Sequence, residues 1–178
     1  MVLGHLRFLT PDREAAVIRP ASPKDARDFM ETMDQVCREG IYLLHERAPR
    51  TAAEQEKIIR TLDRSRNLIA VAELDGIIVG GMGIFAGGMT LKAQGFCNLG
   101  IHIIKRARGK GIGGNMLDYG IEWARLAGYR KICLSVFADN SRAIGLYSSK
   151  GFVVEGRRRE QYIINGKYVD ELLMARFL

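Results

Sequence analysis

The sequence has few of the residues that build disulfide frameworks and metal centres. It contains three cysteines and three histidines, and Cys37, Cys97 and Cys133 lie far apart, with no CxxC pair and no cysteine–histidine cluster. This spacing argues against a metal site and against a set of structural disulfides. We expect buried thiols in a reducing compartment, and no metal.

Long apolar runs are missing as well. The longest stretch without a charged residue covers only residues 76–91, is interrupted by glycines, and is too short for a membrane-spanning helix. The N-terminal segment includes Arg7 and the polar run 10–13, and it has no apolar stretch of signal-peptide length. We therefore expect a cytoplasmic protein with no membrane partner.

The composition is otherwise that of an ordinary globular domain. The chain has 178 residues, of which 47% are hydrophobic and 26% charged, so we expect one domain at residues 15–178 after an irregular extension at 1–14. Lys and Arg number 27 against 20 Asp and Glu, which leaves a net charge of +7. Two runs that contain no acid, 105–110 and 157–159, together hold seven bases, which equals this surplus. Such a concentration indicates an anionic partner at a defined site.

Local signals predict a mixed order of strands and helices. Asp75-Gly76 and Asn165-Gly166 interrupt apolar strands and favour the type I′ turns of hairpins. Ser22 and Thr51 are each followed three residues later by an acid, which is typical of helix starts. The expected strands are 15–19, 68–72, 77–85, 96–104, 131–137, 152–164 and 168–177, and the expected helices are 23–37, 52–65, 111–127 and 140–150. This order predicts a mixed α/β (α+β) fold with about seven strands, about four helices and one parallel step.

The most informative segment is Arg-Gly-Lys-Gly-Ile-Gly-Gly at residues 108–114, which we call the glycine turn. It lies between an expected strand and an expected helix, where successive backbone N–H groups carry partial positive charge. Glycines lack a Cβ atom and let an anion approach the backbone closely. The turn therefore suits a pyrophosphate, and full charges are added by Lys105, Arg106, Arg108 and Lys110.

Other interpretations of the glycine turn stay open when it is taken alone. Gly109, Gly111 and Gly114 fit the GxGxxG pattern of dinucleotide-binding folds, but that pattern needs an acid about 20 residues further on. The chain there reads Gly-Tyr-Arg-Lys, at 128–131. A Walker loop is excluded because no glycine is followed by Lys-Ser or Lys-Thr at the required spacing. A turn with solvated bases and no ligand is the remaining alternative.

Two motifs together resemble the signatures of the GCN5-related N-acetyltransferases. Arg108, Gly111 and Gly113 have the spacing of that family's acetyl-coenzyme A signature, after a strand that ends in Ile-His-Ile. Residues 140–152, Asn-x-x-Ala-x-x-Leu-Tyr-x-x-x-Gly-Phe, are similar to the second signature and lie at its usual distance. The C-terminal hairpin is similar to the ending of the phosphinothricin-type small-amine branch, and ribosomal-protein acetyltransferases have related endings.

The resemblance implies a sheet whose fourth and fifth strands, 96–104 and 131–137, splay apart, and an amine that attacks the thioester of acetyl-CoA directly. The catalytic groups implied are the N–H of Ile103, which would polarise the thioester carbonyl, and the phenol of Tyr147, which would protonate the leaving thiolate. Asn140 would cap its helix and bind the cofactor arm. The residues implied to bind acetyl-CoA are Ile101, His102, Ile103, Arg108, Gly109, Lys110, Gly111, Ile112, Gly113, Gly114, Asn140 and Tyr147.

The sequence lacks the strand carboxylate that some relatives use as a general base, because 95–104 and 131–137 contain no acid. His102 is a candidate general base. Because side chains alternate along a strand, however, its side chain points to the opposite face of the sheet from those of Ile101 and Ile103. A structural role in the core is at least as well supported for it as a catalytic one. In this family the loop between the first two helices lines the acceptor site. Its candidate substrate-binding residues are Glu39, Tyr42, His45 and Glu46.

We predict an N-acetyltransferase that moves acetyl from acetyl-CoA to the primary amine of a small molecule or amino acid in a ternary complex. The alternative acceptors are a peptide N-terminus and a protein lysine. A coenzyme A-binding regulator without catalysis also stays open, although Tyr147 and Asn140 favour an enzyme. Nucleic acid is a disfavoured partner, because the basic run 105–110 contains no aromatic residue. Arg157, Arg158 and Arg159 would attract an acidic acceptor or, as we favour, mark an exposed strand, and a homodimer is left open.

Overall fold

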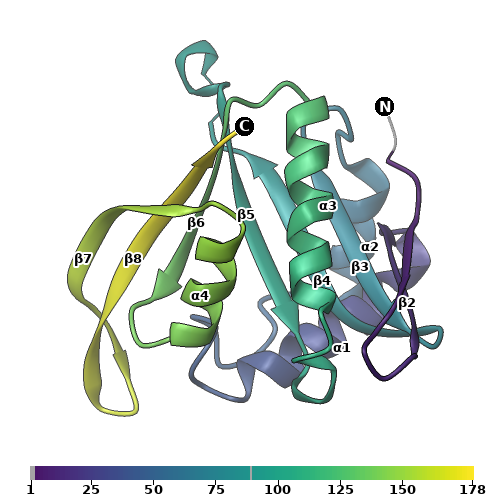
Figure 1. Cartoon of the computed structure of the whole chain (residues 1–178), viewed down its shortest axis with the longest axis horizontal. Coiled ribbons are helices and arrows are strands. Elements are labelled where there is room, and N and C mark those ends of the chain that lie inside the picture. The colour runs from purple at the N-terminus through teal and green to yellow at the C-terminus, as the bar shows by residue number, and fades with distance from the viewer. Residues whose placement is uncertain (1–2, 89) are drawn as a thin grey trace.

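The computed structural model describes residues 3–88 and 90–178. These residues form a sheet of eight strands in the order β1-β2-β3-β4-β5-β6-β8-β7, with helices on both of its faces (Figure 1). The strands are β1 (Leu6–Leu9), β2 (Ala15–Pro20), β3 (Leu68–Leu74), β4 (Ile77–Ala86), β5 (Phe96–Ile103), β6 (Lys131–Phe137), β7 (Val153–Ile164) and β8 (Lys167–Phe177). The α-helices are α1 (Ala26–Cys37), α2 (Ala52–Thr61), α3 (Ile112–Leu126) and α4 (Ser141–Ser149). The mixed α/β fold is confirmed, with one strand more than the seven expected.

The additional strand lies in the N-terminal segment, which we expected to be irregular. β1 pairs antiparallel with β2, from Leu6 opposite Ile18 to Leu9 opposite Ala15. Its residues alternate between half-buried and exposed, as is typical of a strand with one face toward the domain. The expectation of an irregular extension is therefore wrong, because this segment continues the sheet.

Alternation along β3 explains why helices cover both faces of the sheet. Ile69 and Val71 point to one face and belong to the same buried cluster as Phe29 of α1. Ala70 and Ala72 point to the other face and belong to the cluster that includes the apolar side of α3. Since both faces are covered, β3 reads as a nearly continuous apolar run.

The turn signals in the sequence are confirmed. Asp75 and Gly76 have φ angles of 48° and 80°, and Asn165 and Gly166 have φ angles of 50° and 75°. Two successive left-handed residues define the type I′ turn, whose twist matches that of the strands it joins. The β3–β4 and β7–β8 hairpins therefore form as predicted.

The helix starts are also confirmed, with one difference in where a helix ends. The Thr51 N–H donates to the Glu54 carboxylate at 2.8 Å and closes the capping box of α2. α2 ends at Thr61, earlier than the expected end at Ser65. The reason is that Asp63 Oδ1 accepts hydrogen bonds from the N–H and hydroxyl of Ser65, which forms a separate turn. The first helix begins with a 3₁₀ turn, Pro23–Asp25, before α1.

β5 and β6 are parallel neighbours that separate along their length. They pair only at their beginnings, from Phe96 opposite Lys131 to Asn98 opposite Cys133. β5 continues on the edge of β4, and β6 continues on the edge of β8. The expected splay is confirmed, and it leaves the facing edges of both strands without a strand partner.

The remaining expectations about composition concern thiols and membranes. Cys37 and Cys97 are buried, Cys133 is half-buried, and all three are free thiols. Within residues 3–88 and 90–178, no helix is long and apolar enough to cross a membrane.

Candidate active site

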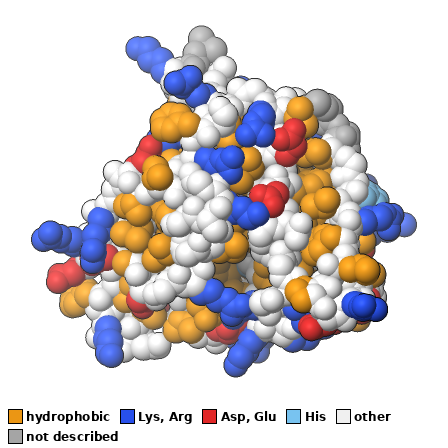
Figure 2. All heavy atoms as spheres, viewed as in Figure 1, with side chains coloured by type: hydrophobic (Ala, Val, Ile, Leu, Met, Phe, Trp, Pro, Cys, Tyr) orange, Lys and Arg blue, Asp and Glu red, His pale blue; other side chains and the backbone are white. Residues whose placement is uncertain are grey.

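The gap between β5 and β6 opens into a cavity of about 450 Å³. It is lined by residues 99–103 of β5, by Ser135 of β6, by the glycine turn and by α4. Tyr42 and Leu43, from the loop between α1 and α2, form a further wall. Figure 2 shows the surface hollowed between α3 and α4, with apolar side chains at the bottom of the hollow.

The backbone of β5 presents hydrogen-bonding groups to this cavity. The Ile104 N–H donates to the Val79 carbonyl at 3.0 Å, so Ile104 faces β4. Because successive residues of a strand face opposite edges, the N–H and C=O of Ile103 face the gap, as do those of Ile101. The backbone of His102 faces β4 instead. The structure thus brings the backbone groups of Ile101 and Ile103 to the gap and directs those of His102 to β4, although His102 also contributes to the cavity lining.

The glycine turn forms the N-terminus of α3 at one side of the cavity. Gly109 and Gly111 have φ angles of 82° and 80°, which favour glycine, and Gly111 is the N-cap of α3. At Gly113 a Cβ atom would lie 3.1 Å from Leu146 Cδ2 and 3.3 Å from Ile103 Cδ1. The turn therefore packs closely against β5 and α4, and the free N–H groups of α3 lie where an anion binds favourably.

Two of the four bases expected around the glycine turn already have carboxylate partners. The Arg108 guanidinium donates to both carboxylate oxygens of Glu39, at 2.8 and 2.5 Å. The Lys110 ammonium contacts Asp12 at 3.0 Å and also Glu14, and these pairs raise the Lys110 pKa. Each of these charges is balanced by an acid distant in sequence, and their contact with the cofactor phosphates stays a prediction.

Arg142 is a cavity residue that the sequence analysis did not single out. It lies in the first turn of α4 and lines the cavity, and its Nη2 is 3.5 Å from the position of a Cβ on Gly109. Within the described chain it has no carboxylate within ion-pair distance. The signal that could have found it is its place two residues after Asn140, inside the second signature. A guanidinium beside the N-terminus of α3 suits a phosphate group.

Asn140 and Tyr147 both line the cavity from α4. The Asn140 side chain accepts a hydrogen bond from the Ala143 N–H at 3.2 Å and is the N-cap, as predicted for the helix start. Tyr147 is 8% exposed and packs near Phe152. Burial raises the Tyr147 pKa to about 12, so the phenol stays protonated at physiological pH. Its hydroxyl bonds to none of the residues in 3–88 and 90–178, which leaves it free to donate.

His102 is placed as a structural residue. Its side chain is 5% exposed, its Nε2 lies 3.1 Å from Thr32 Oγ1, and its ring meets Phe29 edge-on at 5.0 Å between centroids. These contacts hold it against α1. Burial lowers its pKa to about 4, so at neutral pH it is an uncharged histidine held against α1, although the residue also contributes to the cavity lining.

The four candidate acceptor residues are divided by the structure. Glu39 binds Arg108, and Tyr42 lines the cavity with its ring 4.7 Å below the Arg108 guanidinium. His45 and Glu46 are exposed and lie outside the cavity wall. The loop therefore reaches the cavity through Tyr42 and Leu43 alone.

The cavity lining contains no aspartate or glutamate among the described residues. The absence of a strand carboxylate is therefore not compensated by an acid from another element. In the same part of the chain, no cluster of three or more histidines, cysteines or acids could hold a metal ion. The charged side chains that line the cavity are Arg108 and Arg142.

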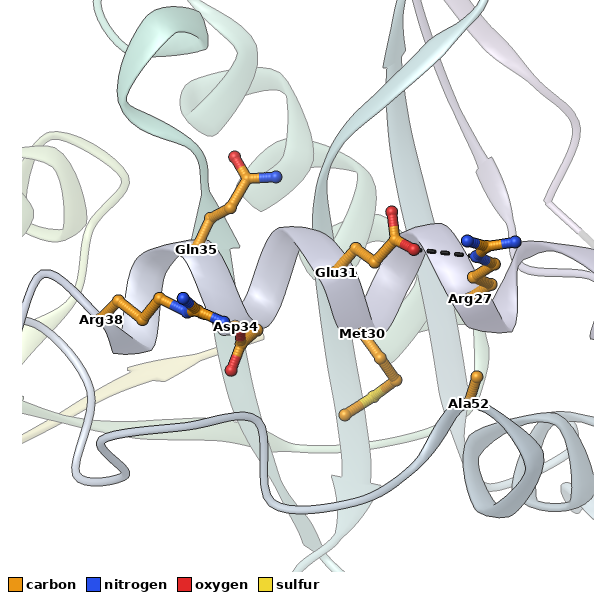
Figure 3. Close-up of a pocket in the computed structure, with 7 residues that line it drawn as sticks. All are labelled: Arg27, Met30, Glu31, Asp34, Gln35, Arg38 and Ala52. Atoms are coloured by element: carbon orange, nitrogen blue, oxygen red, sulfur yellow. Dashed lines mark hydrogen bonds and ion pairs between the residues drawn. The ribbon is translucent and has the colours of Figure 1, made fainter.

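A second cavity, of about 590 Å³, lies between α1 and α2 (Figure 3). Its charged residues are partnered with each other, since Arg27 donates to Glu31 at 2.8 Å and Arg38 donates to Asp34 at 2.7 Å. None of the residues that line it lines the β5–β6 cavity. It is therefore separate from the glycine turn.

The second basic run lies on an exposed strand, as favoured. Arg157 Nε donates to Asp170 at 2.5 Å, and Arg158 donates to Glu171 at 2.8 Å, both across the β7–β8 pair. Arg159 is exposed. Arg157 and Arg158 therefore link the two strands of the hairpin, and all three arginines lie outside the cavity wall.

A splayed parallel strand pair and a glycine-rich helix start beside the gap between its strands are the features expected of an acetyl-coenzyme A-dependent acyltransferase. The model of the acetyltransferase (GNAT) family matches residues 31–152 of this chain. The chain belongs to the GNAT family, and the resemblance inferred from its two motifs is confirmed.

Relatives and solved structures agree with this assignment. The chain is 32% identical to the L-amino acid N-acetyltransferase AaaT of Escherichia coli, over 66% of this chain and 72% of the relative. The fold is similar to that of a GNAT acetyltransferase from Streptococcus pneumoniae, with a TM-score of 0.85, 29% identity, and coverage of 92% of this chain and 99% of the other. It is also similar to that of a phosphinothricin acetyltransferase from Sinorhizobium meliloti in complex with acetyl-CoA, with a TM-score of 0.83, 23% identity, and coverage of 92% and 88%.

The protein is an acetyl-CoA-dependent N-acetyltransferase, and its partners are acetyl-CoA and an amine acceptor. The fit of acetyl-CoA follows from the chain itself, since the gap offers free strand-edge groups for an amide-rich arm and the glycine turn offers N–H groups for a pyrophosphate.

Proposed function

We propose that this enzyme acetylates the primary amine of an amino acid or a similar small molecule that carries an anionic group. The observation that carries the proposal is that no acid lines the cavity among the described residues, so a second ammonium group on the acceptor would meet no carboxylate partner there. A carboxylate on the acceptor meets no like charge in this wall, whereas the second ammonium group of a polyamine would be desolvated without a carboxylate partner. The name of the AaaT relative, an L-amino acid N-acetyltransferase, supports the same acceptor class.

The size of the cavity supports a small acceptor. A volume of about 450 Å³ lies within the range of roughly 300–1,000 Å³ that small-molecule sites occupy. Part of this space belongs to the acetyl-bearing arm of acetyl-CoA. The remainder, beside Tyr42 and Leu43, suits an amino acid better than a folded protein surface. A peptide N-terminus or a protein lysine is an outcome that the test distinguishes.

The residue roles in the proposal follow from the groups that face the gap. Acetyl-CoA supplies the acetyl group as a thioester. The Ile103 N–H faces the place where the thioester carbonyl would lie, and it donates a hydrogen bond as charge develops on that oxygen. Tyr147 donates a proton or a hydrogen bond to the sulfur, whose conjugate acid has a pKa of about 8.5. Because the described cavity wall lacks a carboxylate, we assign removal of the amine proton to solvent water.

The compartment is part of the same proposal. The three free thiols support a reducing compartment such as the cytoplasm.

The test is a panel of amines with detection of the free thiol released from acetyl-CoA. The panel contains L-amino acids, the matching amino acid amides, spermidine and a short peptide. We expect the highest kcat/KM for an amino acid and a loss of at least about tenfold for its amide, which corresponds to roughly 1.4 kcal/mol of lost carboxylate binding. Equal rates for acid and amide, or a preference for spermidine or the peptide, would overturn the acceptor class.

A further inference from the structure

Arg108 makes four contacts that together use most of its hydrogen-bonding capacity. Its two terminal nitrogens bind the Glu39 carboxylate, and its Nε donates to the Ile103 carbonyl at 2.8 Å. Its guanidinium lies over the Tyr42 ring, 4.7 Å from the centroid. The side chains of Arg108 and Glu39 are only 16% and 23% exposed. We call this arrangement the Arg108–Glu39 clasp.

The clasp joins two parts of the cavity that lie far apart in sequence. Glu39 follows α1 at the start of the loop that carries Tyr42, one of the two residues of this loop that line the cavity. Ile103 is the last residue of β5, and its backbone faces the gap. A single side chain therefore fixes the distance between the loop and the strand edge.

The geometry points to a specific role that rests on the proposed function. We propose that Arg108 is a positioning residue for the amine site, which holds Tyr42 and the loop at 38–50 against the end of β5. In this proposal Arg108 is not a ligand of the cofactor phosphates, because both of its terminal nitrogens already donate hydrogen bonds to the Glu39 carboxylate. Arg142 is a cavity-lining cation near the turn that has no carboxylate partner among the described residues.

The chemistry of arginine makes the proposal testable. A guanidinium binds a carboxylate through two parallel hydrogen bonds and stacks on an aromatic ring, whereas a lysine ammonium is a point charge that does neither. A lysine would still serve as a phosphate ligand. Arg108→Lys therefore separates the clasp from phosphate binding, and Glu39→Gln breaks the same clasp from its other end.

The experiment compares Glu39→Gln and Arg108→Lys with a matched control, Glu56→Gln. Glu56 also pairs with an arginine, Arg60, but on the exposed surface of α2. For each protein, calorimetry gives the Kd for coenzyme A, and thiol release gives KM and kcat for the best amino acid of the panel. Limited trypsin digestion, which needs no activity, measures cleavage after the exposed Arg47 and Arg50 of the loop.

We expect both clasp variants to raise the amine KM about tenfold, the equivalent of roughly 1.4 kcal/mol. Their Kd for coenzyme A should stay within about twofold, and the loop should be cut several times faster than in the control. The double variant should lose no more than either single variant, because both remove one interaction.

Three results would overturn the inference. The first is a weaker Kd for coenzyme A in Glu39→Gln and Arg108→Lys at an unchanged amine KM. The second is a normal amine KM in Arg108→Lys, and the third is loop cleavage no faster than in Glu56→Gln. If the wild-type enzyme binds coenzyme A but acetylates no small amine, the proposed function fails, while the trypsin rates still decide whether the clasp holds the loop.

Discussion

Replacement of Tyr147 by phenylalanine tests the chemistry at the centre of the site. Tyr147 is 8% exposed and lines the gap, and the part of the chain that the structure describes offers its hydroxyl no hydrogen-bond partner. Tyr147→Phe therefore removes one oxygen without breaking a bond in the fold. We expect a change in the free energy of unfolding within about 0.5 kcal/mol, since no buried partner is left unsatisfied.

The expected effect on the rate follows from the leaving group. General acids contribute typically 10²–10⁴-fold, and a thiolate with a conjugate-acid pKa of about 8.5 leaves without much help. The loss should therefore lie at the low end, about 10²-fold in kcat. The Kd for coenzyme A should change less than about threefold, because the phenol contacts only the reacting end.

The pH dependence gives a second readout for the same residue. Burial raises the Tyr147 pKa to about 12, so at pH 9 only about one phenol in a thousand is ionised. Between pH 7 and pH 10 the wild-type rate should show no descending limb from this group. A loss of activity centred near pH 10 that disappears in Tyr147→Phe would contradict the buried environment assigned to the phenol.

The matched control is Tyr119→Phe. Tyr119 is also a buried tyrosine, 5% exposed, with a pKa raised to about 12, but it lies on α3 outside the cavity wall. Its kcat should stay within about twofold of the wild type. If Tyr147→Phe and Tyr119→Phe have the same rate as the wild type, Tyr147 has no part in the chemistry and is only a core residue.

Three further predictions concern the turn, the phosphate site and the core. Gly111→Ala places a side chain at a φ angle of 80°. It should lower the free energy of unfolding, measured by urea denaturation, by about 1–2 kcal/mol and should also weaken the binding of coenzyme A. An unchanged urea denaturation curve would refute the strain. Arg142→Gln should weaken binding of coenzyme A about tenfold but leave pantetheine binding unchanged, and equal losses for both ligands in calorimetry would remove Arg142 from the phosphate site. Burial lowers the pKa of His102 from 6.5 to about 4. Between these pH values His102 is therefore protonated in the unfolded chain and neutral in the folded chain. Stability should therefore fall by about 3 kcal/mol as pH falls from 6.5 to 4. His102→Gln should remove this dependence, and the exposed His5→Gln should keep it.

Local turn chemistry explains why most of the fold was predictable. Asp75-Gly76 and Asn165-Gly166 form type I′ turns because their own backbone preferences require it, whatever lies around them. β1 was missed for the opposite reason. Leu6–Leu9 is a short edge strand whose hydrogen bonds come from β2, and a four-residue segment carries too little pattern to indicate a partner.

Within the site, too, features set by neighbouring residues were predictable from the sequence, and contacts set by tertiary packing were not. The glycine turn and the cap at Asn140 depend on residues a few positions apart, and the sequence analysis placed both. The partners of Arg108 and Lys110 are 69 and 96–98 positions away. No motif relates an arginine to an acid at that separation, because only the packing of the loop and the β1–β2 turn against the glycine turn brings them together. Arg142 was missed because a single arginine inside a helix signature resembles an ordinary solvated residue.

Ion pairing decides which of the surplus positive charges contribute to the electrostatic field at the glycine turn. The net charge of +7 is a sum and does not depend on which acids meet which bases, but the field at the glycine turn does. Arg108 and Lys110 are neutralised by neighbouring carboxylates, whereas Lys105, Arg106 and Arg142 meet no carboxylate within ion-pair distance among the described residues. The turn therefore stays positive through Lys105 and Arg106 of the basic run together with Arg142, which lies outside that run. Exposed charges of this kind are screened by salt, so coenzyme A should bind more weakly as ionic strength rises, and the half-buried Arg108–Glu39 clasp should respond less.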